Sequence, residues 1–106
     1  MITLEKITTI VAVSLLLTAT NSVIADGAAL YTAKGCMACH GADAKTPITP
    51  LYPKIAGQAK EYLAQQMTDI KSGARNNGQT AAMKGVMAGV SEDEIGTIAE
   101  YLSGLK

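Results

Sequence analysis

Two cysteines and a histidine near the front of the chain are the residues best suited to do chemistry. Residues 36–40 read Cys-Met-Ala-Cys-His, so Cys36 and Cys39 are three positions apart and His40 follows at once. Two thiols spaced in this way can each bond one vinyl group of a porphyrin, and the adjacent imidazole can ligate its iron. His40 is the only histidine in the sequence. The motif therefore predicts one covalently attached haem c, with His40 as the proximal iron ligand.

Three other uses of these side chains explain them less well. A thioredoxin-like dithiol needs a βαβ pattern, and no stretch of the sequence alternates apolar and polar residues like a strand. A zinc site needs four ligands, and two cysteines with one histidine fall short. A local disulfide would close too small a loop to stabilise much, and it would leave His40 unexplained.

The N-terminal segment is typical of a secretory signal peptide. Residues 7–24 carry no charge, Lys6 precedes them, and Ala25 supplies a small residue at the expected cleavage position. We therefore expect residues 1–25 to be removed, which leaves residues 26–106 as a single domain. If the chain is bacterial, export in this way predicts a periplasmic location.

A retained membrane anchor is the alternative for the same segment. Its 18 uncharged residues are just long enough to cross a bilayer, but polar residues interrupt them near the end. Those interruptions favour cleavage, after which no stable membrane insertion is expected.

Composition limits the classes of partner and the kind of core. Nine basic and nine acidic residues balance, which argues against binding of nucleic acid. Phenylalanine and tryptophan are absent. A small domain without these side chains needs another source of core volume, and a large flat porphyrin would supply it.

The rest of the sequence predicts helices and loops. Asp26 can cap a short helix ahead of the haem motif, and residues 41–58 contain the prolines and glycines of an irregular loop. A helical apolar period covers about residues 60–72, with Gly73 as a plausible stop. Residues 73–79 form a turn-rich connection.

The last helix has the clearest signal. Ser91 and Glu94 match a capping box, and the apolar residues after them recur with helical spacing on one face. Several helices without a strand predict an all-α fold, a small helical domain wrapped around one haem.

Together these features resemble a class I c-type cytochrome of the small, soluble, single-haem bacterial kind. The resemblance spans residues 26–106, and its segments are 36–41 for the haem motif, 53–58 for the stretch after the histidine, and 83–101 for the distal loop and final helix. In that family, a glycine and an aromatic residue on the first helix cross an aliphatic and an aromatic residue on the last. That crossing is matched in this sequence by Gly27 and Tyr31 on the first helix and by Ile98 and Tyr101 on the last.

A methionine is the expected sixth ligand. Met1 leaves with the signal peptide, Met37 is tethered between the cysteines, and Met67 lies on the apolar stripe of a helix. Met83 follows small residues and precedes the cap of the last helix by a distance that resembles the family's spacing. We therefore expect Met83 to be the distal iron ligand, with Met87 as the alternative.

Supporting residues around the haem are less well defined by sequence. The Pro53 carbonyl is a candidate acceptor for the His40 Nδ1 proton, and Pro50 competes with it. Asn76, Asn77 and Gln79 could reach a propionate, although a turn uses such residues anyway.

A histidine–methionine pair would fill both axial positions, which predicts electron transfer rather than an enzyme. The expected protein is a monomeric carrier between respiratory-chain partners, a membrane donor complex and an oxidase or reductase acceptor. The alternative is a haem-bearing subunit of a periplasmic dehydrogenase or reductase complex. A gas sensor or peroxidase would require an open iron face.

Overall fold

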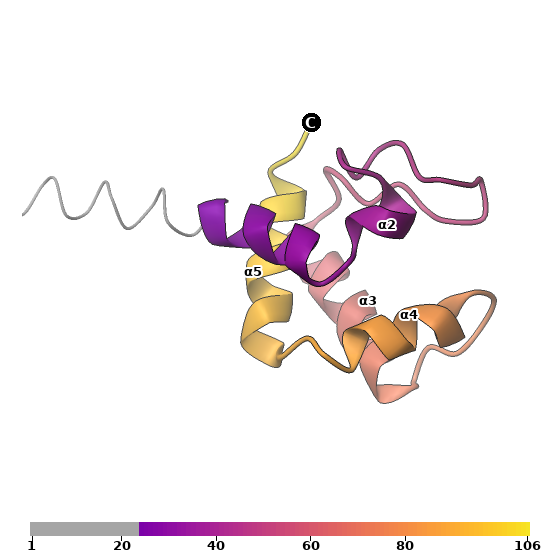
Figure 1. Cartoon of the computed structure of the whole chain (residues 1–106). Helices are drawn as coiled ribbons and strands as arrows, with labels where there is room; N and C mark the ends of the chain where they lie inside the picture. Colours follow the sequence, from indigo (N-terminus) through magenta and orange to yellow (C-terminus); the bar gives the residue numbers. More distant parts are fainter. Residues whose placement is uncertain (1–23) are drawn as a thin grey trace, which may run out of the picture.

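The computed structural model describes residues 24–106, so the predicted signal peptide lies almost wholly outside the described residues. Residues 24–33 are helical, and further helices follow in the order α2 (Met37–His40), α3 (Lys60–Ser72), α4 (Thr80–Met87) and α5 (Glu92–Ser103) (Figure 1). The described part of the chain contains no strand. The predicted all-α fold is therefore confirmed. No helix within this part is both long and apolar enough to cross a membrane.

The helix over residues 24–33 crosses α5 at very short range (Figure 1). Gly27 is buried at the crossing, where a methyl group in place of its hydrogen would collide with Tyr101 and lie 3.1 Å from the Thr97 carbonyl oxygen. Tyr31, one turn later, packs against Tyr101 with ring centroids 6.0 Å apart. The predicted contact of Gly27 and Tyr31 with the last helix is confirmed for Tyr101.

The first helix does not begin where the sequence indicated. Residues 24 and 25 are already helical, so Asp26 lies inside the helix. The prediction that Asp26 caps this helix is wrong for the chain described here. Ala25 is a strong helix former, and nothing in this stretch stops the helix from starting before the aspartate.

The predicted bounds of α3 are confirmed. The helix runs from Lys60 to Ser72, and Gly73 follows with a left-handed φ of 88°. A residue with a side chain would be strained in that conformation, so glycine ends the helix at low cost. The buried face of α3 carries Leu63, Met67 and Ile70.

The capping box of α5 is also confirmed. The Ser91 hydroxyl accepts from the Glu94 backbone N–H at 3.2 Å, and Glu94 Oε1 accepts from the Ser91 backbone N–H at 2.9 Å. These bonds satisfy donors that the first turn of a helix otherwise leaves unpaired. Four residues of the helix are then buried against the rest of the domain: Ile95, Ile98, Ala99 and Leu102.

Helix α4 was not predicted from the sequence. It occupies the segment in which two candidate methionines were recognised, and it packs on α3. Lysine side chains from two other helical segments donate hydrogen bonds to the turn after it. Lys34 Nζ donates to the Gly89 carbonyl at 2.9 Å, and Lys71 Nζ donates to the Val90 carbonyl. These bonds place α4 relative to both α3 and the first helix.

The loop between α2 and α3 is ordered by its own hydrogen bonds. Asp43 Oδ1 accepts from the backbone N–H groups of Lys45 and Thr46 at 2.8 and 2.9 Å. The bond from Lys45, followed by those from Thr46, lowers the pKa of Asp43. The loop closes onto α2 because the Ile48 backbone N–H donates to the Cys39 carbonyl at 3.1 Å.

Candidate haem-binding site

The predicted attachment residues lie at and around the short helix α2. Cys36 is its N-cap and Cys39 and His40 form its last turn. Both cysteines are free thiols and partly buried, and burial raises the pKa of Cys36. All three side chains line the same cavity. The structure thus brings together the two thiols and the imidazole that the motif singled out.

His40 is oriented by a hydrogen bond on the side away from the predicted haem. Only 7% of the residue is exposed, and its Nδ1 lies 3.0 Å from the Pro53 carbonyl oxygen. A carbonyl can only accept, so Nδ1 carries the proton and donates it. The other ring nitrogen, Nε2, is then the neutral donor available to a metal. Of the two prolines considered, Pro53 is the one that supports His40.

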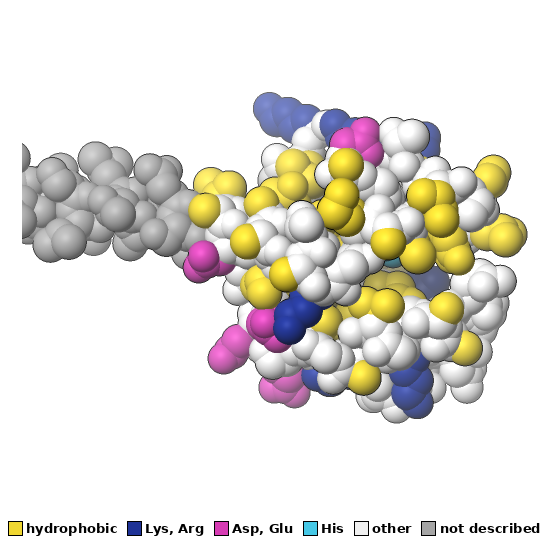
Figure 2. All heavy atoms as spheres, viewed as in Figure 1, with side chains coloured by type: hydrophobic (Ala, Val, Ile, Leu, Met, Phe, Trp, Pro, Cys, Tyr) yellow, Lys and Arg dark blue, Asp and Glu magenta, His cyan; other side chains and the backbone are white. Residues whose placement is uncertain are grey.

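A cavity of about 440 Å³ opens beside α2. Figure 2 shows the hollow on the right of the molecule, with hydrophobic side chains around it. Its volume falls in the range of sites that take up a cofactor. The lining is mainly apolar and comes from the loop before α3 and from α3, α4 and α5: Leu51, Tyr52, Ile55, Leu63, Met67, Ile70, Met83, Val86, Met87, Ile98 and Leu102.

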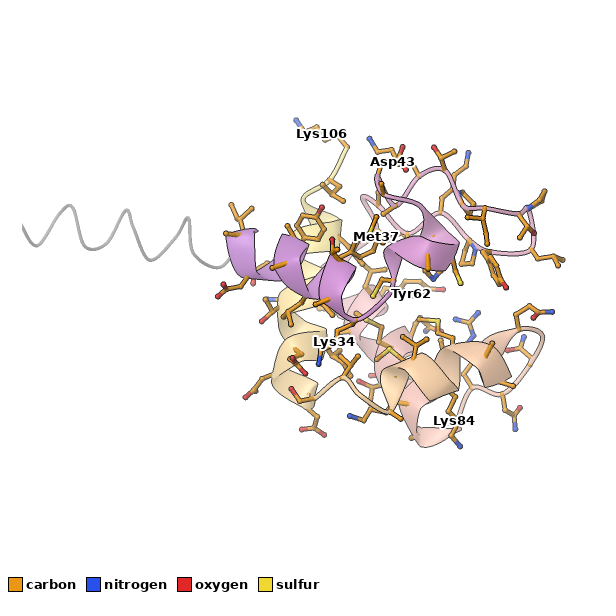
Figure 3. All side chains as sticks on the ribbon, in the orientation of Figure 1. Lys34, Met37, Asp43, Tyr62, Lys84 and Lys106 are labelled. Atoms are coloured by element: carbon orange, nitrogen blue, oxygen red, sulfur yellow. The ribbon has the colours of Figure 1, made fainter. Side chains whose placement is uncertain are left out.

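The wall opposite α2 is formed in part by α4, which Figure 3 shows on the far side of the gap. Met83 and Met87 both line the cavity, one helical turn apart on the same face. Met87 is 2% exposed and belongs to the hydrophobic core, whereas Met83 is partly buried and packs at the edge of that core. Met67 is a buried core residue, as predicted, and Met37 lies at the surface.

Arg75 is a lining residue that the sequence interpretation did not single out. It is the charged side chain among the residues around the cavity, and its Nη1 donates to Gln66 Oε1 at 3.1 Å. A cation there would offset the negative charge of a porphyrin propionate. Asn77 and Gln79 also line the cavity. The only sequence signal for Arg75 was its position in the turn-rich connection, which on its own predicts a loop.

These residues fit a haem. Two free thiols and an imidazole with its Nε2 available stand at one wall, an apolar cavity extends from them, and a thioether stands at the opposite wall. An all-α domain with this donor set is typical of proteins that bind haem covalently.

Comparison with known proteins identifies the family. The cytochrome c family matches residues 24–106. Cytochrome c4 of Pseudomonas aeruginosa is 42% identical over 71 residues, which cover 67% of this chain and 33% of that protein. Cytochrome c-554(548) of Halomonas halodenitrificans is 37% identical over 68 residues, covering 64% of this chain and 81% of the relative. The chain therefore belongs to the cytochrome c family and is a class I c-type cytochrome.

A solved structure agrees with this assignment. Reduced recombinant cytochrome c4 from Pseudomonas stutzeri superposes with a TM-score of 0.70 and 31% identity, over 81% of this chain and 50% of that chain. The match with the Pseudomonas aeruginosa relative spans about a third of that protein's length. Membership of the family implies covalently bound haem c.

Proposed function

We propose that this chain is a diffusible one-electron carrier whose haem is bonded to Cys36 and Cys39 and whose iron is ligated by His40 and Met83. The observation that carries the proposal is the placement of these groups on opposite walls of one apolar cavity. Bound haem supplies the chemistry, which is the exchange of one electron at iron. The residues of the chain fix its position and its axial donors.

Its hydrogen bond to Pro53 and its position in the motif support His40 as the proximal ligand. The Pro53 carbonyl restrains the imidazole and makes it a stronger donor. His40 follows directly after the second cysteine, so attachment of the haem would bring the iron to this ring.

Met83 is favoured over Met87 by its surroundings. The Met87 side chain is enclosed in the core, so turning it to a ligand would leave a void among its neighbours. Met83 packs only at the core's edge and still faces the cavity. Its soft thioether favours ferrous iron and raises the reduction potential.

Spectroscopy and mass measurement test this proposal. The purified protein should carry one haem that survives acid extraction, a sulfur-to-iron band in its ferric spectrum, and a one-electron potentiometric titration. Replacing Cys36 and Cys39 with alanine should abolish the covalent link, whereas Met37→Ala, at the exposed position between them, should retain it. His40→Ala should yield no stable holoprotein.

Two results would overturn parts of the proposal. Haem that extracts freely from the natural sequence would contradict covalent attachment through the two cysteines. A ferric spectrum without the sulfur band, together with rapid binding of carbon monoxide, would favour an open iron face and hence a sensor or peroxidase.

We also propose export to the periplasm as a monomer, with cleavage after Ala25. The signal pattern in residues 1–25 supports the location. The intact mass of protein from the periplasm should correspond to a chain that begins at Asp26. A mass that includes residues 1–25 would instead indicate a protein anchored by its N-terminal segment.

One relative favours a dehydrogenase as the electron donor. A thiosulfate dehydrogenase electron acceptor from Stutzerimonas stutzeri is 33% identical over 100 residues, covering 88% of this chain and 45% of that protein. Gel filtration of a native extract distinguishes a carrier from a subunit. Elution of the haem at the mass of the free chain supports a carrier, and stable co-elution with a dehydrogenase supports the subunit.

A further inference from the structure

Tyr31 is a buried residue with a polar group that the proposed function does not use. It lies on the helix over residues 24–33 and is 2% exposed. Its hydroxyl donates to the carbonyl of Gly41 at 2.6 Å, and Gly41 is the residue that directly follows His40 in the chain. Burial, followed by the proximity of Cys36, raises the pKa of Tyr31 to about 12, so the hydroxyl keeps its proton at neutral pH.

The same residue is bonded to both ends of the haem-attachment segment. The backbone carbonyl of Tyr31 accepts from the Cys36 N–H at 3.1 Å, and its hydroxyl reaches the carbonyl of Gly41. Residues 36–41 hold both cysteines and His40. One tyrosine from the core thus fixes the beginning and the end of the segment that must present all three groups to the haem.

Hydrogen bonds continue from Gly41 toward the residue that orients the imidazole. The Gly41 carbonyl also accepts from the Ala44 N–H at 3.2 Å, and the Ala44 carbonyl accepts from the N–H groups of Ile55 and Ala56 at 2.9 and 3.2 Å. Those two residues come just after Pro53, whose carbonyl receives the His40 Nδ1 proton. The Tyr31 hydroxyl therefore restrains both the backbone that carries the imidazole and the loop that carries its acceptor.

Gly41 has little room to compensate if this bond is lost. Its φ is 89°, and a methyl group at its Cα would collide with the Thr46 carbonyl group, so the backbone there is closely packed. Its N–H donates to the Met37 carbonyl at 3.0 Å. Without the tyrosine hydroxyl, the Gly41 carbonyl would keep only the longer bond from Ala44.

We propose that the Tyr31 hydroxyl is a positioning group that sets the orientation of the His40 imidazole against the Pro53 carbonyl. The inference rests on the proposed ligation of iron by His40. Loss of the hydroxyl weakens the hydrogen bond at Nδ1, which makes the imidazole a poorer donor to ferric iron. The reduction potential then rises, although the ring of residue 31 still fills its place in the core.

Tyr31→Phe in the holoprotein tests this inference, with Tyr101→Phe as the matched control. Both variants lose one hydroxyl from the same aromatic pair, and of the two tyrosines it is Tyr31 whose hydroxyl bonds to the attachment segment. Tyr31→Phe should raise the midpoint potential and move the paramagnetically shifted haem-methyl resonances of the ferric form, which report imidazole orientation. Tyr101→Phe should leave both measurements as in the natural sequence. Circular dichroism at the assay temperature confirms that the folded proteins are compared.

The results separate this inference from the proposed function. An unchanged potential and unchanged methyl resonances in Tyr31→Phe would overturn the positioning role. Equal shifts in both variants would also overturn it, because they would reflect general packing of the aromatic pair. If the proposed function is wrong, the ferric spectrum of the protein with its natural sequence will lack the signs of histidine ligation, before any variant is compared.

Discussion

Met83 and Met87 are neighbouring residues of one type with different surroundings. They lie one helical turn apart on α4 and both reach the haem cavity. The core encloses Met87, which is 2% exposed, while Met83 remains at the edge of the core. A core position fixes a side chain through its contacts on all sides, and an edge position leaves a thioether free to bind a metal.

Met83→Ala should therefore change the chemistry of the iron. The sixth coordination position should open, so that the ferric form becomes partly high-spin and loses its sulfur-to-iron band. Added cyanide or carbon monoxide should bind readily. The potential should fall because the thioether's preference for ferrous iron is removed. Optical titration and potentiometry of the variant measure these effects.

Met87→Ala is the control for this prediction. It should keep the sulfur band and the potential while lowering the free energy of unfolding by about 2–5 kcal/mol, the usual cost of truncating a buried methionine. Loss of the band in Met87→Ala with its retention in Met83→Ala would invert the assignment. Retention of the band in both would make Met67, the third methionine that lines the cavity, the candidate.

At the scale of elements, the start of α5 combines a capping box with an ion pair. Glu94 accepts the Ser91 backbone N–H and pairs with Lys34 Nζ at 3.3 Å. The bond from Ser91, followed by the hydrogen bond from Lys34, lowers the pKa of Glu94 from 4.5. Lys34 also donates to the Gly89 carbonyl. Glu94 and Lys34 together therefore link α5 to the end of the first helix and to the turn after α4.

A lowered pKa predicts a definite dependence of stability on pH. At a pH above 4.5, the ordinary pKa of a glutamate carboxyl, ionised Glu94 stabilises the folded chain. This stabilisation is lost as the pH falls through the lower pKa that Glu94 has in the folded chain. Glu94→Gln should therefore be less stable than the natural sequence at neutral pH. The difference should shrink as the solution is acidified below 4.5. Chemical denaturation at a series of pH values measures it.

Glu92→Gln is the matched control for the pH series. Glu92 also lies in the first turn of α5, so it shares the interaction with the helix dipole, but the capping box uses Glu94. A stability difference of equal size and equal pH dependence in both variants would assign the effect to the dipole alone.

For the whole molecule, the close crossing of the first helix and α5 matters most to how the described helices assemble. This contact brings the segment that leads into the haem motif against the last helix, and the aromatic pair Tyr31 and Tyr101 packs beside it. The core contains no phenylalanine or tryptophan. A haem in the cavity would contribute apolar contacts to α3, α4 and α5 at once, so its attachment should stabilise the assembled helices.

Gly27→Ala should force this crossing apart. The added methyl group would meet Tyr101 and the Thr97 carbonyl, and overpacking of this kind costs about 1–3 kcal/mol. Thermal or denaturant unfolding of the holoprotein measures the loss. Gly96→Ala is the control on α5, because a methyl group there meets no described atom within 4 Å. That variant should be more stable by up to about 1 kcal/mol, the difference in helix propensity. Equal destabilisation of both variants would contradict a specific role for the crossing.

Features that depend on a few adjacent residues could be predicted from the sequence alone. The spacing of Cys36, Cys39 and His40 indicated haem attachment, and Ser91 with Glu94 marked the start of the last helix. Gly73 marked the end of α3. Such signals are readable because the capping bonds and turn conformations involved are formed within one or two helical turns.

Which distant segments meet became known from the tertiary structure. It selected Pro53 over Pro50 as the partner of His40, placed Arg75 at the cavity, and enclosed Met87 in the core while leaving Met83 at its edge. It also formed α4, where the sequence indicated only two methionines, and began the first helix before Asp26. These outcomes depend on packing between residues far apart in the chain, and no local pattern specifies how such surfaces fit together.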